Sequence, residues 1–148
     1  MNNLIVFVYK VPNRNVFIMA TIFTRIIKGE IPCYKVAENE DFIAFLDINP
    51  IVKGHILVVP KVEIDYIFDQ DDATLADIMP FSKRVAKALE AVVPCGRVCL
   101  AVIGLDVPHT HIHLLPTNKM SDFNFKNRFP MSSDEMTTLA AEIATKFE

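Results

Sequence analysis

The stretch that says most about this chain runs Val107-Pro108-His109-Thr110-His111-Ile112-His113-Leu114-Leu115-Pro116. It places three of the chain's four histidines within five residues. The pattern predicts a strand, in which alternate side chains share a face, so His109, His111 and His113 would line one side. Ile112 and Leu114 would point to the other side, into a core. Three imidazoles on one face make little sense as packing, and they indicate a chemical site.

Two kinds of chemistry use histidines in this arrangement. Neighbouring imidazoles can bind one zinc ion, but this needs a further ligand, for which His55 or Asp106 would have to serve. Alternatively, a neutral imidazole attacks phosphorus near pH 7 and forms a labile adduct. A second imidazole then stabilises anionic oxygens and protonates the leaving group. Close imidazoles keep different protonation states, because like charges repel.

The residues on either side of this stretch predict helices and strands of ordinary length. Thr21 can cap a short helix that Gly29 ends, and Ser132 with Glu135 forms a capping box for a C-terminal helix. A longer helix is expected from an apolar stripe, interrupted by Pro80, that comprises Leu75, Ile78, Met79, Val85, Leu89, Val92 and Val93. Strands are expected at 34–37, 42–46, 55–59, 98–103 and 109–115. Their short connections favour antiparallel pairing, so the expected fold is α+β, with an antiparallel sheet of about five strands and helices.

Length and composition predict one ordered domain. The 148 residues fit a single domain, expected at 19–148, and residues 1–18 form an N-terminal extension in which 4–9 could add a strand. Hydrophobic residues make up 51% of the chain and charged residues 22%. The net charge of −3 and the lack of a basic cluster argue against nonspecific binding to nucleic acid or an anionic membrane.

The same features predict a cytoplasmic protein. No apolar stretch approaches the length of a membrane span, and the opening residues lack the features of a signal peptide. The three cysteines, Cys33, Cys95 and Cys99, have no disulfide or zinc-pair spacing. They are expected to be reduced thiols.

With three further stretches, the histidine run resembles the histidine triad (HIT) family, in particular the short bacterial branch of purine nucleoside phosphoramidases. The likeness covers residues 20 to about 116. It is carried by Ile22-Phe23-Thr24-Arg25-Ile26-Ile27-Lys28-Gly29-Glu30-Ile31-Pro32, by Ala44-Phe45-Leu46-Asp47-Ile48-Asn49-Pro50 and by Lys53-Gly54-His55-Ile56-Leu57-Val58-Val59-Pro60-Lys61.

The resemblance implies a role for each matching residue. His111 would be the nucleophile, and His109 and His113 would contact phosphate oxygens and assist the leaving group. Asp47 would accept hydrogen bonds from ribose hydroxyls, although a turn cap before Asn49 is an equal alternative. An apolar pocket for a purine would comprise Phe23, Ile26, Ile31, Phe45, Ile48 and Leu57, each of which, taken singly, is more often plain core.

The function implied is hydrolysis of a nucleoside 5′-phosphoramidate through a nucleotidyl-histidine intermediate. Cleavage of dinucleoside polyphosphates is an alternative within the same chemistry, and a nucleotide-binding or scaffolding module with little turnover is an alternative of another class. The family also implies a homodimer joined across a helix and an edge strand. We expect a purine nucleotide as the ligand and no cofactor.

Two departures from the family pattern affect these expectations. Thr21 and Thr24 stand where many bacterial relatives have a Cys-x-x-Cys pair that helps to bind zinc, so no metal is expected there. Asp106 stands near where a hydroxyl usually contacts the phosphate. Its carboxylate either turns outward, away from the phosphate, or this chain contacts the phosphate in a different way from its relatives.

Overall fold

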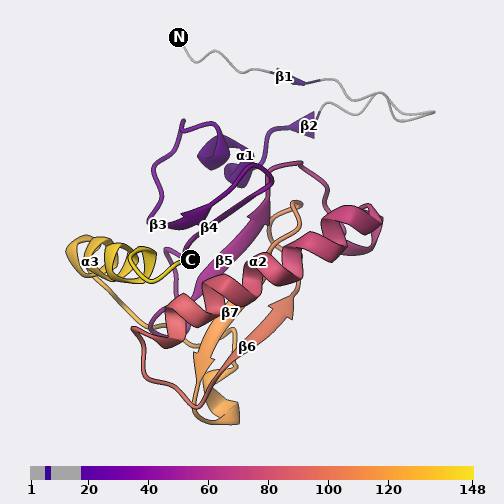
Figure 1. Ribbon diagram of the computed structural model, residues 1–148. Coiled ribbons are helices and arrows are strands. Elements are labelled where there is room, and N and C mark those ends of the chain that lie inside the picture. The colour runs from indigo at the N-terminus through magenta and orange to yellow at the C-terminus, as the bar shows by residue number, and fades with distance from the viewer. Residues whose placement is uncertain (1–5, 8–17) are drawn as a thin grey trace.

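The computed structural model describes residues 6–7 and 18–148 of the chain (Figure 1). Its centre is a five-stranded antiparallel sheet with the order β3-β4-β5-β7-β6. The strands are β3 (Lys35–Glu38), β4 (Phe42–Leu46), β5 (Ile56–Pro60), β6 (Arg97–Val102) and β7 (Ile112–Thr117). This architecture confirms the expected α+β class and the antiparallel sheet of about five strands.

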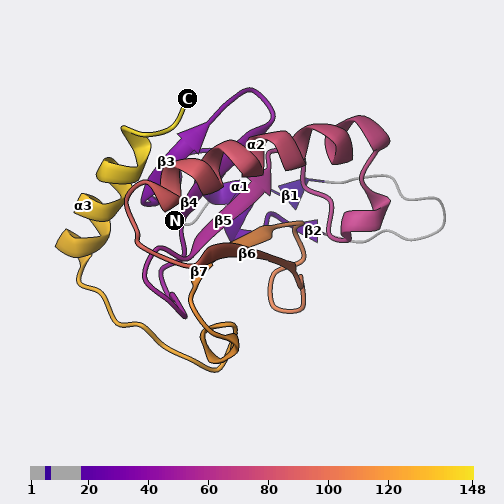
Figure 2. The ribbon, with the colours of Figure 1, turned by 60° about the horizontal axis from the view of Figure 1, so that its bottom comes forward.

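Three helices cover the two faces of this sheet. They are α1 (Ile22–Ile27), α2 (Asp72–Glu90) and α3 (Ser133–Ala144), with short 3₁₀ turns η1 (Ile67–Asp69) and η2 (Met120–Asp122). Helices α2 and α3 lie on one face (Figure 2) and share the larger core with strand residues such as Ile112 and Leu114. On the other face, Phe23 of α1 packs against a smaller cluster that includes Phe45 and Leu57. The histidine stretch therefore separates a packed core from a second, α1-covered face.

The helix ends follow the capping chemistry of the sequence. The Thr21 hydroxyl accepts a hydrogen bond from the Thr24 N–H (3.2 Å), and Gly29, with φ of +74°, lies just beyond the end of α1. Ser132 and Glu135 form the expected capping box at the start of α3. These local signals place the ends of α1 and α3 where the sequence predicts them.

Helix α2 differs in detail from the sequence-based expectation. It is one continuous helix through Pro80, and Asp71 caps its first residue by accepting a hydrogen bond from the Thr74 N–H (2.7 Å). Met79, expected on the apolar stripe, is 51% exposed, whereas Phe81 is buried. The buried face follows Ile78, Phe81, Val85 and Leu89 at helical spacing, and Met79 lies one residue off it.

The N-terminal part adds a small antiparallel pair of strands. Strand β1 (Val6–Phe7) pairs with β2 (Ile18–Met19). The rest of the strand expected at 4–9 lies outside the described residues, and the boundary between an extension at 1–18 and a domain at 19–148 stays a prediction.

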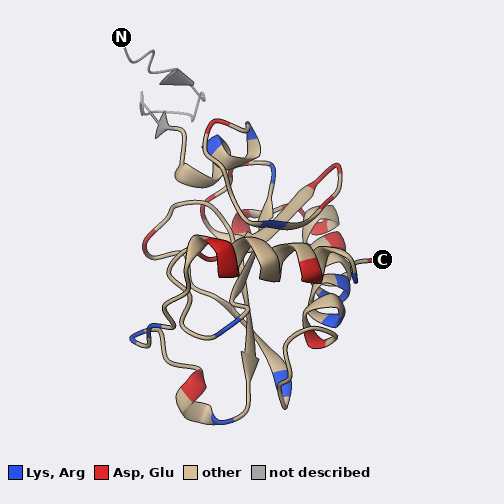
Figure 3. Ribbon diagram, turned by 90° about the vertical axis from the view of Figure 1, so that its left-hand side faces the viewer, with Lys and Arg blue, Asp and Glu red and all other residues tan. Residues whose placement is uncertain are grey.

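Charged residues are spread over the molecule rather than gathered. Figure 3 shows acidic and basic positions interspersed along the helices and loops, with no basic stripe in the part of the chain described. Within that part, no helix combines the length and apolar character needed to cross a membrane. A phosphate ligand would therefore have to be held by local geometry rather than by a broad positive field.

Candidate active site

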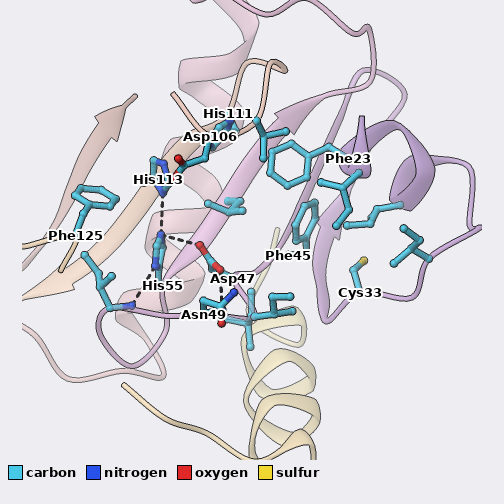
Figure 4. Close-up of a pocket in the computed structure, with 18 of the residues that line it drawn as sticks. Phe23, Cys33, Phe45, Asp47, Asn49, His55, Asp106, His111, His113 and Phe125 are labelled. Carbon is cyan, nitrogen blue, oxygen red and sulfur yellow. Dashed lines mark hydrogen bonds and ion pairs between the residues drawn. The ribbon is translucent and has the colours of Figure 1, made fainter. Parts of the chain in front are cut away.

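A cavity of about 540 Å³ opens between α1, the loop after β4 and the histidine stretch (Figure 4). Every residue expected to bind the nucleotide lines it: Phe23, Ile26, Ile31, Phe45, Asp47, Ile48 and Leu57. His111 and His113 line the same cavity. The structure thus brings the expected apolar pocket, the expected ribose carboxylate and two of the three histidines together.

Other residues of the cavity were missed by sequence reasoning, namely Ile22, Cys33, Asn49, Val107, Phe125 and Arg128. Phe125 makes edge contacts with His113, at 5.0 Å between ring centroids, and with His55, at 6.3 Å. Its segment returns to the site because the Phe129 N–H donates to the Pro50 carbonyl (2.8 Å). This irregular segment has no periodic pattern, so no signal in the sequence places it at the cavity.

The hydrogen bonds of His111 determine which of its ring nitrogens is available. Its Nδ1 lies 2.7 Å from the carbonyl oxygen of His109. Because a carbonyl only accepts, Nδ1 carries the proton, and in the neutral ring Nε2 carries the free lone pair. His111 also packs its ring edge-on to Phe23, at 5.1 Å between centroids. The ring is therefore held as a nucleophile with Nε2 available.

The tautomer of His113 is set through His55. The Ile51 N–H donates to His55 Nδ1 (3.3 Å), so His55 carries its proton on Nε2. That Nε2–H donates to His113 Nδ1, which lies 2.9 Å away and therefore carries no proton. His113 consequently carries its own proton on Nε2, as a hydrogen-bond donor. The chain from Ile51 through His55 thus gives His111 and His113 opposite tautomers.

Burial keeps these imidazoles neutral. Desolvation, with a smaller contribution from nearby His111, lowers the pKa of His55 to about 4. Desolvation, followed by His111 and His55, lowers the pKa of His113 to about 3, although Asp47 opposes this. Near pH 7 both rings therefore hold a single proton, consistent with the hydrogen bonds described above.

Asp47 lies beside this pair at the end of β4. One carboxylate oxygen accepts a hydrogen bond from the Asn49 N–H (2.8 Å), and the other lies 3.6 Å from His55 Nε2. Asp47 therefore caps the turn before Asn49, and it also lies on the cavity wall. The cap fixes the carboxylate and leaves its second oxygen facing the site.

His109 is placed differently from the other two histidines. It is fully buried, and its Nε2 donates to the Pro60 carbonyl (2.8 Å) while its Nδ1 lies 2.9 Å from the Thr21 hydroxyl. It packs against Phe23 on the side of the sheet that α1 covers, but it is not among the described residues that line the cavity. Burial lowers its pKa. With both nitrogens occupied, His109 holds α1 against the histidine stretch, and its placement gives no support to the expected phosphate contact.

Thr21 and Thr24 form a hydrogen-bonded cluster with Glu63. One Glu63 oxygen accepts from the Thr24 hydroxyl and from the Thr21 N–H (3.1 Å). The Thr21 hydroxyl lies 3.2 Å from the same Glu63 oxygen and 2.9 Å from His109 Nδ1. Because His109 Nε2 donates to the Pro60 carbonyl, Nδ1 is an acceptor, and the hydroxyl proton donates to it at the shorter of the two distances. At the place of the family's Cys-x-x-Cys pair, this chain therefore joins α1, the segment after β5 and the histidine stretch by hydrogen bonds.

The ligand atoms of Asp47, His55 and His113 also lie within 4.8 Å of one another, close enough for a metal site. A metal bound to His55 Nε2 would move the proton of that ring to Nδ1. There it would face the Ile51 N–H, and two donors would oppose each other. The second coordination layer therefore favours the hydrogen-bonded pair over a metal.

Comparison with known proteins agrees with this geometry. Residues 28–120 match the model of the HIT domain. The chain belongs to the histidine triad family. This HIT chain is 36% identical over 137 residues to the adenosine 5′-monophosphoramidase of Schizosaccharomyces pombe, covering 88% of this chain and 100% of that protein. It is 33% identical over 132 residues to an uncharacterized HIT-like protein of Borreliella burgdorferi, covering 83% and 95% of the two chains.

Solved HIT structures share the fold. A HIT-like protein of Bartonella henselae superimposes with a TM-score of 0.74 at 27% identity, covering 85% of this chain and 95% of its own. A zinc-bound histidine triad protein of Mycobacterium smegmatis gives a TM-score of 0.72 at 27% identity, covering 86% and 95%. The sheet and its helices are therefore features of the HIT fold.

Proposed function

We propose that this HIT protein hydrolyses nucleoside 5′-phosphoramidates, with the cavity as its nucleotide site and His111 as its nucleophile. The observation that carries the proposal is the pair of opposite tautomers, a bare Nε2 on His111 beside an Nε2–H on His113. The named activity of the Schizosaccharomyces pombe relative, an adenosine 5′-monophosphoramidase, supports it.

In the first step, Nε2 of His111 attacks the α-phosphorus as the bond to the leaving nitrogen breaks. The leaving nitrogen departs as an amine with a proton taken from solvent, while the Nε2–H of His113 donates a hydrogen bond to an oxygen of the phosphate. The positive charge that develops on the His111 ring is stabilised by the hydrogen bond from its Nδ1 to the His109 carbonyl. The product of this step is a nucleotidyl-histidine.

In the second step, water attacks the phosphorus and the bond to His111 Nε2 breaks. The proton of the water passes to solvent, so His111 and His113 keep their starting tautomers, and the nucleotide leaves with a free phosphate. His55 acts as a positioning residue, since it reaches the reaction only through His113. His109 positions α1 and holds no reacting atom.

The rest of the cavity suits a purine nucleotide. Phe23, Phe45 and Leu57 form an apolar wall on the α1 side, where a flat base can be desolvated. Asp47, between that wall and the histidines, is placed to accept both hydroxyls of a ribose. This order along the cavity matches base, sugar and phosphate.

The protein is further proposed to be a cytoplasmic homodimer. Strand β6 is an edge of the sheet, and Leu100 on it is 41% exposed. Met79 of α2, the helix that covers that face of the sheet, is also exposed. An unpaired strand edge with exposed apolar side chains is readily covered by a second copy.

The proposal is tested by AMP release from adenosine 5′-phosphoramidate after metal removal. Wild type should be active without metal, and His111→Ala should lose at least about 100-fold in kcat, as expected for loss of a nucleophile. Quenching of wild type and labelled substrate with denaturant at alkaline pH should trap nucleotide on the protein, and His111→Ala should trap none. Full activity of His111→Ala would refute the mechanism, and AMP binding without turnover in wild type would favour a binding module.

A further inference from the structure

Asp106 lies at the histidine end of the cavity, on the turn that leads into the histidine stretch. Figure 4 shows it beside His111 and His113. The turn begins at Gly104, with φ of +70°. It is anchored beyond Asp106, because Val107 packs into the α1-side cluster and its carbonyl accepts from the His109 N–H (2.8 Å). Asp106 is therefore held at the rim of the cavity rather than on a free loop.

The Asp106 carboxylate is not compensated by a partner. Among the residues that the structure describes, none forms a hydrogen bond or ion pair with it, whereas Asp47 is held by the Asn49 N–H and lies near His55. The Arg128 guanidinium also lines the cavity, where its Nη1 donates to the Phe125 carbonyl (3.1 Å) and the Asn127 carbonyl (2.6 Å), and it forms no ion pair with Asp106. The Asp106 carboxylate therefore carries its negative charge without a direct partner at the end of the cavity where the leaving group departs.

This charge acts on the leaving group more than on the rest of the substrate. The base and ribose lie toward Phe23 and Asp47, so a group that leaves from the phosphorus extends toward the rim. A rim carboxylate attracts a cation and repels an anion there, within a screening length of about 8 Å at physiological salt. Because the site is open to solvent, the effect should be about 3- to 10-fold in rate rather than orders of magnitude.

We propose that Asp106 selects leaving groups that carry positive charge, so that the preferred substrates are nucleoside 5′-phosphoramidates of an amine with a second ammonium group. This inference rests on the proposed function and names the substrate class of the same site. It also disfavours dinucleoside polyphosphates, whose leaving group is an anion.

Three adenosine 5′-phosphoramidates whose leaving amines have three-carbon chains of different charge test the proposal. Their amines are 1,3-diaminopropane (cationic), propylamine (neutral) and β-alanine (anionic). The quantity compared is the ratio of kcat/KM between substrates, which cancels any general loss of activity in a variant. Wild type should prefer the cationic substrate over the neutral one by about 3- to 10-fold, and the anionic one should be the poorest.

Asp106→Asn should bring these ratios close to one, and Asp106→Lys should reverse their order. Asp77→Asn on α2, on the opposite face of the sheet, removes the same charge elsewhere and should keep the wild-type ratios. Added salt should weaken the preference of wild type. If Asp106→Asn keeps the wild-type order of the three substrates, the inference about Asp106 is wrong but the proposed function stands. Equal rates for all three substrates in wild type would have the same meaning. Failure of wild type to cleave any of them overturns the proposed function as well.

Discussion

Among single residues, the chemistry depends on which imidazole nitrogen carries a proton. Backbone groups determine this for two of the rings, since the His109 carbonyl fixes the tautomer of His111 and the Ile51 N–H fixes that of His55. The hydrogen bond from His55 Nε2 to His113 Nδ1 then fixes the tautomer of His113. The sequence pattern shows which histidines are near one another, but not these backbone partners. The division of labour between His111 and His113 follows from their partners, and not from their spacing.

Because these histidines are buried as neutral rings, we predict that the free energy of unfolding decreases in mild acid. The folded-state pKa values of His55 (about 4) and His113 (about 3) lie below the ordinary value of 6.5, so the unfolded chain binds protons that the folded chain does not. The contribution of these histidines to the free energy of unfolding is therefore fully present above pH 6.5. It is lost as pH falls toward 4, by up to about 1.4 kcal/mol per pH unit for each histidine.

Denaturant unfolding at half-unit steps from pH 7 to 4.5 measures this slope. In His55→Gln one of these groups is absent, so the slope should be shallower than that of wild type. A wild-type free energy of unfolding that stays level between pH 6.5 and 5 would contradict neutral burial of these rings.

Residue identities at the site were predictable where a local pattern or the family resemblance carries them. The apolar wall, Asp47, His111 and His113 all line the cavity as expected. The role expected for His109 stays a prediction, but its position differs from the alternation rule, which assumes a strand from 109, whereas β7 begins at Ile112. Outside the strand, the ring of His109 is directed by Pro60 and Thr21. Arg128 could not be predicted, since its position depends on the path of an irregular segment.

Among the elements, α1 connects the fold to the site. It is a short helix, of 6 residues, and such a helix has little stability of its own. Thr21 caps it and also binds His109, while Glu63 holds both Thr21 and Thr24. Phe23 and Ile26 of the same helix line the cavity. Nucleotide affinity should therefore depend on hydrogen bonds that lie outside the cavity.

Thr21→Ala tests this dependence against a matched helix cap. Loss of the Thr21 hydroxyl should lower the free energy of unfolding by about 1–2 kcal/mol and weaken AMP binding several-fold, because α1 loses its anchor. Asp71→Ala removes the cap of α2, at a similar cost in stability, but α2 lies on the other face of the sheet. Titration calorimetry should show unchanged AMP affinity for Asp71→Ala. Equal effects of the two substitutions on affinity would exclude this role of α1.

The order and ends of most elements were predictable, because caps and glycines are local. Helix α2 was the exception, since an inner proline removes one backbone hydrogen bond and crowds the preceding turn, yet the helix continues through Pro80. Tertiary packing of Phe81 and Val85 against the sheet outweighs that loss. The strand order, with β7 between β5 and β6, is a long-range property that the local pattern does not contain.

For the whole molecule, the fold accounts for the site but leaves the β6 edge uncovered. One face of the sheet is closed by α2 and α3, and the other carries α1 and the cavity. The edge at β6 keeps Leu100 exposed on the α2 side, where Val98 and Val102 already pack inward. A second copy that pairs through β6 would bury Leu100 and extend the sheet.

We therefore expect twice the chain's mass in light scattering of wild type at micromolar concentration. Leu100→Asp places a charge in the centre of the proposed interface, where its desolvation is unfavourable, and should shift the mass to that of one chain. Met120→Asp, at a side chain that is 86% exposed in η2, is the matched control and should remain dimeric. If Leu100→Asp stays dimeric while folded, the copies associate through another surface. Because β6 pairs with β7, the strand that carries His113, loss of the dimer should also lower kcat for the phosphoramidate, which the same samples can show.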